Sequence, residues 1–281
     1  MKVLISVDME GATGTTDPED VLRDGDDYQR ARQMMTRDAN AAALGAFDAG
    51  ATEVIVNDSH WEARNILQED LDPRVIYIKG FHKPLIMMEG LTDDTDAVVF
   101  VGYHARTGTE GAVLNESLLG KEIQNLLMDG EPIGEIKLNS LMAGDFGVPV
   151  VFLSGDDKAC QEAEALLGSN LETFAVKEGI DKFAARCLHP DVTEKGIRQG
   201  VARALARLDS FSPYRLEGPA RFGIDWNSTT IASLCELIPT VKKTTPRITE
   251  FSSSDMREAF GVIFIELLVG IHIGQSSRVY G

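Results

Sequence analysis

Two acidic residues, Asp8 and Glu10, stand at alternate positions just after the apolar run 3–5 and just before Gly11. A short apolar run that ends in this way is typical of a buried strand whose polar end lies at the edge of a sheet. Two carboxylates placed together at such an edge repel each other unless a cation lies between them. Taken alone they could also be ordinary loop acids, so the interpretation depends on the residues at the ends of the other strands.

Two histidines come after two further predicted strands. His60 ends the polar segment 57–60 after an apolar run at 52–56, and His104 comes directly after the apolar run 97–103. Because the carboxyl ends of parallel strands share one edge of a sheet, we expect these side chains to converge with the two acids. A single histidine at a strand end is more often structural, but two of them beside an Asp-x-Glu pair favour a metal site. Oxygen and nitrogen donors without thiolates suit zinc, cobalt or manganese, and a carboxylate such as Asp8 can bridge two ions.

The elements that must position these residues alternate between short apolar runs and helical patterns. This alternation predicts an α/β fold with a doubly wound, mostly parallel sheet. Strands are expected at 2–7, 52–56, 75–78, 97–103, 123–128 and 150–153, and helices at 28–49, 63–71, 136–146 and 156–167. Beyond Pro190 the pattern changes to helices at 192–208 and 254–271 with β-like segments at 215–224 and 241–251. We therefore predict a metal-binding α/β domain at residues 1–190 and a smaller C-terminal α+β layer at 191–281, serving oligomerisation and the substrate pocket.

Composition excludes several classes of function. The chain has 281 residues and a net charge of −17, which disfavours nucleic acid and anionic membranes as partners because both bind clustered Lys and Arg. Its three cysteines, Cys160, Cys187 and Cys235, form no C-x-x-C pair, so we expect a reducing, cytoplasmic location rather than a disulfide framework. The most apolar segment, 261–274, is shorter than the roughly 20 residues of a membrane helix and is expected to be a buried helix.

Six motifs in this chain resemble the zinc-dependent D-aminopeptidases of the DppA type. They are Ser-Val-Asp-Met-Glu-Gly (6–11), Glu-Val-Ile-Val-Asn-Asp-Ser-His (53–60), Lys-Pro (83–84) with Met-Glu-Gly-Leu (88–91), Gly-Tyr-His-Ala-Arg (102–106), Pro-Ile-Gly-Glu (132–135) with Leu-Asn (138–139), and Gly-Asp-Asp (155–157). The resemblance runs in the same order along essentially the full chain.

This resemblance implies a site of two zinc ions per chain, with cobalt or manganese as alternative metals. Asp8 would bridge the ions, Glu10 and His60 would complete one ion, and His104 with Glu135 would complete the other. From the residues alone, Glu135 would be interpreted as an acid that stabilises a helix N-terminus. The resemblance also implies a ring-shaped homodecamer with its sites facing an inner chamber, and short peptides beginning with D-alanine as substrates.

One departure from the family pattern concerns the catalytic machinery. The family has a catalytic histidine about eleven residues after the second metal-binding histidine, whereas this chain has Leu-Asn-Glu-Ser at 114–117. Asn115 could donate a hydrogen bond there and Glu116 could carry a proton, so both are candidate catalytic residues. Arg106 could hold a substrate carboxylate with its planar guanidinium, or could simply pair with a surface acid.

These observations predict a metal-dependent hydrolase that cleaves short peptides from the amino terminus by means of a metal-activated water molecule. Two alternatives stay open at this point. The chain could be a dinuclear metal amidase that acts on a non-peptide amide. It could also be a ring-forming metal-binding relative that lost catalysis together with the family histidine.

Overall fold

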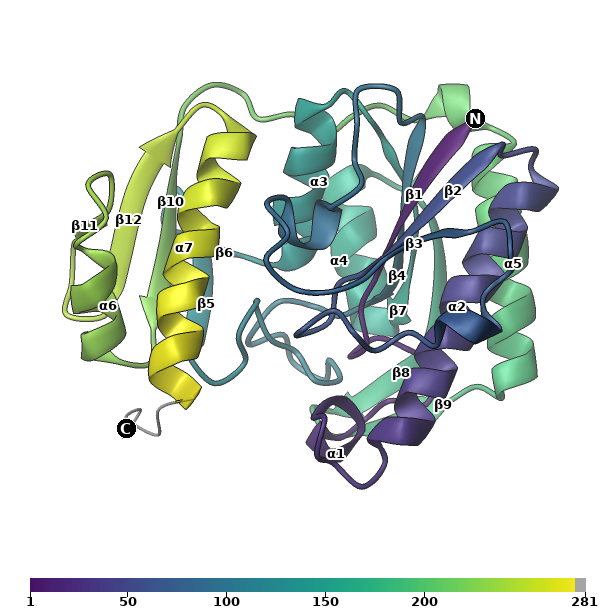
Figure 1. The fold of residues 1–281 in the computed structure, drawn as a ribbon, viewed down its shortest axis with the longest axis horizontal. Coiled ribbons are helices and arrows are strands. Elements are labelled where there is room, and N and C mark those ends of the chain that lie inside the picture. The colour runs from purple at the N-terminus through teal and green to yellow at the C-terminus, as the bar shows by residue number, and fades with distance from the viewer. Residues whose placement is uncertain (276–281) are drawn as a thin grey trace.

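The computed structural model describes residues 1–275 and contains two β-sheets (Figure 1). The larger sheet has seven strands in the order β3-β2-β1-β4-β7-β8-β9. They are β1 (Lys2–Val7), β2 (Glu53–Asp58), β3 (Ile76–Ile78), β4 (Ala97–Tyr103), β7 (Val150–Asp156), β8 (Glu172–Asp181) and β9 (Ala184–Cys187). All neighbours pair in parallel except β8 and β9. The predicted α/β fold with a mostly parallel sheet is therefore confirmed.

Helices cover both faces of this sheet. α2 (Tyr28–Asp48) and α5 (Pro190–Leu205) lie together on one face, while α3 (Glu135–Asp145) and α4 (Asp157–Leu167) lie on the other (Figure 1). The small residues of α2 allow its close approach to α5, since a Cβ on Gly45 would lie 2.3 Å from the carbonyl oxygen of Arg198. The central strands β1, β2, β4 and β7 are buried on both faces, which explains why they are nearly continuous apolar runs.

The smaller sheet is antiparallel and has five strands in the order β11-β12-β10-β5-β6. They are β5 (Ile123–Met128), β6 (Glu131–Ile133), β10 (Ala220–Trp226), β11 (Lys242–Lys243) and β12 (Ile248–Ser253). The long helix α7 (Met256–Gln275) packs between this sheet and α3, and the short helix α6 (Thr229–Cys235) packs against its outer part (Figure 1). No helix among residues 1–275 has the length and apolar character needed to cross a membrane. The predicted buried helix near the C-terminus is thus α7.

The two sheets do not divide the chain at residue 190. β5 and β6 belong to the smaller sheet although they precede that residue, and α5 follows it but lies on the larger sheet. The turn at Asp129 and Gly130, both with positive φ, folds β5 back on β6 as a hairpin, and β5 then pairs with β10. The predicted regions 1–190 and 191–281 therefore interleave in space, and residues 276–281 lie outside the described residues.

Two further expectations differ from the structure. The helix expected at 63–71 is a loop with one 3-10 turn, Gln68–Asp70, because the Asp58 carboxylate accepts the backbone N–H groups of Asn65 and Ile66 and fixes an irregular path. The hairpin of β8 and β9 is absent from the predicted strands, since its residues alternate only weakly between buried and exposed. The remaining short elements are α1 (Pro18–Val21) and the 3-10 turns Ile86–Met88 and Leu208–Ser210.

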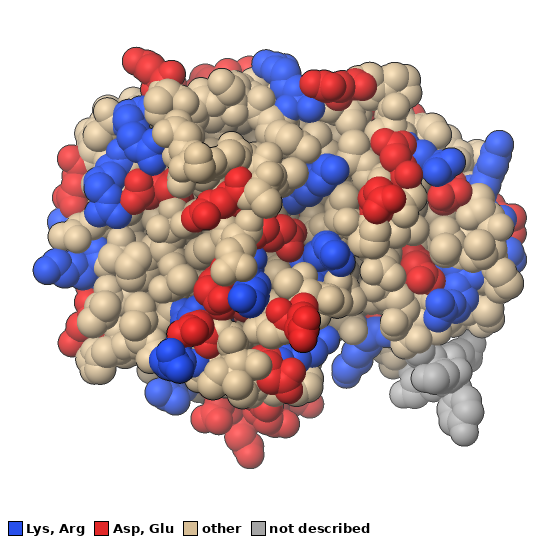
Figure 2. Space-filling model, turned by 180° about the vertical axis from the view of Figure 1, so that it is seen from behind, with Lys and Arg blue, Asp and Glu red and all other residues tan. Residues whose placement is uncertain are grey.

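Acidic and basic side chains are interspersed over the face shown in Figure 2, and acidic ones gather at the lower edge of that view. The net negative charge of the chain is therefore spread over a mixed surface on this side rather than confined to one patch.

Candidate metal centre

The candidate centre lies where β1, β2 and β4 end side by side. Val7 is in register with Asp58 of β2 and with Val101 of β4, so the residues that come after these strands meet at one edge. Asp8, His60 and His104 are brought together there, as the sequence predicts. Glu10 follows on the same loop as Asp8, and Glu135 enters from the first turn of α3. All five side chains are buried.

These five residues form two groups that share Asp8. In the first group, His60 Nδ1 lies 3.0 Å from Glu10 Oε2 and 3.4 Å from Asp8 Oδ1. In the second, His104 Nε2 lies 3.4 Å from Asp8 Oδ2 and 3.4 Å from Glu135 Oε1. Each group has its candidate ligand atoms within 4.8 Å of one another. The two oxygens of Asp8 therefore face different groups, which is the arrangement that a bridging carboxylate requires.

Backbone carbonyls fix the orientation of both imidazoles. His60 Nε2 lies 2.9 Å from the carbonyl oxygen of Val21, and His104 Nδ1 lies 3.0 Å from that of Ala105. Since a carbonyl only accepts hydrogen bonds, the nitrogen facing it carries the donated proton, and the other nitrogen of each ring faces the carboxylates. Metal-binding histidines are commonly held in this way.

The donor set fits a bound metal. Buried carboxylate and imidazole donors surround a place where His104 Nε2 and Glu116 Oε2 are buried without a hydrogen-bond partner among the described residues. Buried polar atoms of this kind are costly unless they are paired or bind an ion. Oxygen and nitrogen ligands without sulfur match zinc or a related divalent ion.

The carboxylates and imidazoles of the centre shift one another's pKa values. Burial acts to raise the pKa of Asp8, but the adjacent imidazoles of His104 and His60 outweigh it and hold that pKa well below its usual range. Burial acts to lower the pKa of both histidines, but the carboxylates beside them raise it well above the ordinary value. The carboxylates therefore favour positive charge on this site, whether it comes from protons or from metal ions.

A buried lysine that sequence reasoning missed holds the loop carrying Glu10. Lys177 Nζ donates to the carbonyl oxygens of Glu10 (2.6 Å), Ala12 (2.9 Å) and Thr15 (2.5 Å). Burial lowers the pKa of Lys177 to about 8. In the same loop, a Cβ on Gly11 would lie 1.9 Å from the carbonyl oxygen of Tyr103, so only glycine allows the loop to pass β4 this closely. Lys177 and Gly11 thus fix the path that presents Glu10.

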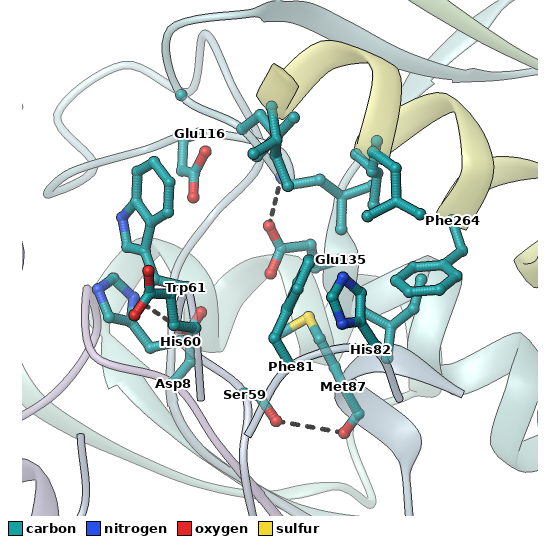
Figure 3. A pocket seen from close by; sticks show the side chains of 18 of the residues that line it. Asp8, Ser59, His60, Trp61, Phe81, His82, Met87, Glu116, Glu135 and Phe264 are labelled. Atoms are coloured by element: carbon teal, nitrogen blue, oxygen red, sulfur yellow. Dashed lines mark hydrogen bonds and ion pairs between the residues drawn. The ribbon is translucent and has the colours of Figure 1, made fainter. Parts of the chain in front are cut away.

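A cavity of about 310 Å³ opens on the centre. Asp8, His60, Glu116 and Glu135 lie on its wall, and Figure 3 shows the carboxylates of Glu116 and Glu135 pointing into the same space. The opposite wall comes from α7 and from the segment around Phe81. A substrate in this cavity would therefore contact the centre directly.

The model of the D-aminopeptidase family, peptidase family M55, matches residues 1–265. The chain belongs to this family. A D-aminopeptidase of Bacillus subtilis (strain 168) is 36% identical over 266 residues, which cover 94% of this chain and 96% of the relative.

A solved structure agrees with this assignment. It is that of the Zn-dependent D-aminopeptidase DppA from Bacillus subtilis, described as a self-compartmentalizing protease. Its TM-score is 0.91 at 35% identity, over 96% of this chain and 98% of that one. The predicted family, fold and peptide-hydrolysing activity are therefore confirmed. Neither the non-peptide amidase nor the non-catalytic binding protein is favoured.

Within this family member, the two candidate catalytic residues lie in different surroundings. Asn115 faces its own loop, where Oδ1 accepts from Gly108 N (3.0 Å) and Nδ2 donates to Ala112 O (2.9 Å). Glu116 faces the centre, with Oε1 3.9 Å from His104 Nε2. Of the two, only Glu116 lies on the wall of the cavity.

Arg106 is not on the described wall of the cavity. Its guanidinium Nη1 donates to the carbonyl oxygen of Thr107 (3.0 Å), and its backbone N–H donates to Glu162 Oε2 (2.9 Å). The backbone of Arg106 also forms an isolated β-bridge with that of Glu116. Arg106 thus supports the segment that carries Glu116, rather than offering its guanidinium to the cavity.

Proposed function

We propose that this chain is an aminopeptidase that removes the first residue of short peptides, with a preference for D-amino acids, and that it binds two zinc ions. The observation that carries this proposal is the pair of buried ligand groups joined by Asp8, one completed by Glu10 and His60 and the other by His104 and Glu135. The zinc dependence named for the DppA relative supports the choice of metal.

The ions would lower the pKa of a water molecule at the centre toward neutrality and polarise the carbonyl of the bond to be cleaved. The residues of the chain supply the rest. His60 and His104 are held rigidly by backbone carbonyls, so the ligand geometry is fixed before substrate binds. The buried position of the centre limits bulk water, which strengthens each electrostatic interaction there.

The free amino group of a peptide finds a favourable surface in this cavity. Four acidic residues line it, namely Asp8, Glu62, Glu116 and Glu135, while no Lys or Arg is found among the described residues of its wall. A protonated amine is attracted to such a surface and a free carboxylate is not. This charge pattern supports cleavage from the amino terminus.

Glu116 is the residue of the 114–117 segment that reaches the centre. We assign it the proton transfer, because its carboxylate faces the centre and lies in neither ligand group. With metal bound, its carboxylate would accept a proton from the attacking water molecule and return it to the leaving amine. Asn115 has no such access, since both ends of its amide are bound to the loop.

The proposal is tested by measuring amino acid release from D-Ala-D-Ala and from L-Ala-L-Ala with zinc-loaded protein. We expect faster cleavage of the D-peptide, loss of activity with a chelator and its return with zinc. Asp8→Ala removes the shared ligand and should abolish both zinc binding and turnover, whereas the exposed Asp94→Asn should change neither. Full turnover by Asp8→Ala, or a cleavage rate that is unchanged by the chelator, would contradict the proposal.

We further propose that the chain assembles into a closed ring, a homodecamer, as expected from the family. Support comes from the description of the DppA relative as self-compartmentalizing and from large exposed apolar side chains on and after the β8–β9 hairpin, namely Ile180, Phe183, Leu188 and Val192. Apolar groups gathered on a surface often mark a protein interface. The cytoplasmic location stays a prediction that rests on the cysteine pattern.

A further inference from the structure

The cavity beside the centre has one apolar wall that the proposed chemistry does not use. Residues of α7 spaced three and four apart face it, so one side of the helix forms a continuous surface. Phe81 packs beside this helix, with its ring 6.0 Å from that of Phe264 in an edge-to-face arrangement. Figure 3 shows Phe264 and Phe81 on one side of the cavity and Asp8, His60 and Glu116 on the other. The apolar wall consists of Phe81, Ile86, Phe264, Leu267, Leu268 and Ile271.

The backbone around this cavity is unusually strained. Seven non-glycine residues among the described ones have positive φ, and four of them line the cavity: Trp61 (49°), His82 (64°), Ile86 (50°) and Leu118 (65°). Left-handed conformations are costly for such side chains and persist where the surrounding structure imposes them, most often at ligand sites. The shape of the cavity, including the apolar wall at Ile86, is thus maintained at a cost in stability, which points to a ligand that needs it.

The cavity has room for more than the methyl side chain of alanine. Its volume of about 310 Å³ is at the lower end of the range for sites that enclose small molecules, and a methyl group fills only a small part of it. An apolar side chain placed here would leave water for a largely apolar surface, which is favourable in proportion to the area removed from water.

We propose that the preferred substrates carry a large apolar side chain on one of the two residues joined by the scissile bond, and that this side chain packs against the wall formed by Phe81, Phe264 and Leu268. This inference rests on the proposed function and specifies its substrate class. A leucine- or phenylalanine-sized side chain should raise kcat/KM roughly tenfold to a hundredfold over alanine.

Two series of peptides test this inference with zinc-loaded protein. The first varies the amino-terminal residue in D-Xaa-Gly and the second varies the next residue in D-Ala-D-Xaa, with Ala, Leu and Phe at Xaa. A rise of tenfold or more from Ala to Leu or Phe in either series supports the inference and identifies the side that enters the cavity. Equal or falling values in both series overturn it, while cleavage of D-Ala-D-Ala would still support the proposed function.

A binding measurement decides the inference even if no peptide is cleaved. Trp61 lies on the cavity wall and is half-exposed, so its fluorescence should report a bound ligand. Phenethylamine should bind at least tenfold more tightly than methylamine, and Trp61→Phe should remove the signal while the buried Trp226 stays unchanged. Equal binding of the two amines would overturn the inference, whereas a failure of cleavage alone would count against the proposed function.

Two neighbouring residues of α7 provide a matched pair of variants. Phe264 lies on the cavity wall, while Ile265 is exposed. Phe264→Ala should reduce the preference for large over small side chains at least fivefold, and Ile265→Ala should leave that ratio unchanged. Circular dichroism checks that both variants are folded. Equal ratios for Phe264→Ala and the parent protein would contradict the assigned wall.

Discussion

Glu116 is the acidic side chain of the centre whose role differs most from its neighbours. It lies on the cavity wall near His104, yet it belongs to neither ligand group. Burial raises its pKa well above the ordinary value, and the nearby charge of Glu135 acts in the same direction. A carboxylate in such surroundings can serve as a proton carrier only if it keeps its acidic group, which makes a neutral isostere informative.

Glu116→Gln should lower kcat by about 100-fold to 10,000-fold, because the amide has a similar shape but no titratable group. Zinc content, measured by atomic absorption, should stay that of the parent protein. A parallel loss of zinc would instead assign Glu116 to the ligands.

Asn115→His should bring no gain in activity, since the side chain at this position faces Gly108 and Ala112 rather than the cavity.

Single residues also mark where sequence reasoning reaches its limit. Asp8, Glu10, His60 and His104 can be found because each comes after an apolar strand, and parallel strands bring their ends together. Glu135 opens a helix after a hairpin, a context in which acids are common, so only the family resemblance singles it out. Lys177 lies in a strand that the sequence does not predict, and a buried lysine bound to three carbonyls has no local sequence signal.

At the scale of elements, α7 combines two different faces. One face forms the apolar wall of the cavity, and the other carries the buried Glu266, whose Oε1 accepts a hydrogen bond from Thr249 Oγ1 (2.6 Å) in β12. The other oxygen of this carboxylate has no hydrogen-bond partner among the described residues. Burial raises the pKa of Glu266 to about 7.

This pKa shift makes the stability of the protein depend on pH. Because the folded-state pKa lies above the ordinary value of 4.5, the folded protein binds the proton more tightly than the unfolded chain between about pH 4.5 and 7. The free energy of unfolding should therefore fall as pH rises through this window, by roughly 3 kcal/mol from this group. Glu266→Gln, which keeps an acceptor for Thr249, should lose that part of the pH dependence.

Urea unfolding of both proteins at pH 5 and pH 8 measures this effect. Other titrating groups contribute equally to the parent and the variant, so they cancel in the difference. We expect the variant to gain stability relative to the parent at pH 8 compared with pH 5. If the difference in free energy of unfolding between variant and parent is the same at pH 5 and pH 8, Glu266 does not titrate in this range.

Elements differ in how far the sequence predicts them. The β-strands of the larger sheet can be recognised where they are buried on both faces and therefore form apolar runs, as in β1 and β4. The hairpin of β8 and β9 is partly exposed and mixes polar with apolar residues, so it contains no such run. The helix expected at 63–71 does not form because the Asp58 side chain replaces the helical hydrogen bonds of Asn65 and Ile66.

At the scale of the whole molecule, the proposed ring can be tested directly. Light scattering should give about ten times the chain mass of 30.6 kDa. Phe183→Glu places a charge among the exposed apolar side chains near the β8–β9 hairpin and should reduce that mass. Leu237→Glu, at an even more exposed position in the other layer, serves as the control. A monomer mass for the parent protein would contradict the ring.

The interleaved sheets have a consequence for the way the chain is made. β5 and β6 leave the ribosome long before β10 and β12. Among the strands of residues 1–275, β5 pairs only with β6 and β10, so it has β6 alone as a partner until residues 220–226 are synthesised. An isolated two-stranded hairpin is marginally stable at best. α3 begins just after β6 and carries Glu135 in its first turn. The position of this last metal ligand therefore depends on strands that are synthesised much later. A nascent chain can thus complete the Asp8, Glu10 and His60 group once Lys177 has been made, but the second half of the centre only near the end of translation.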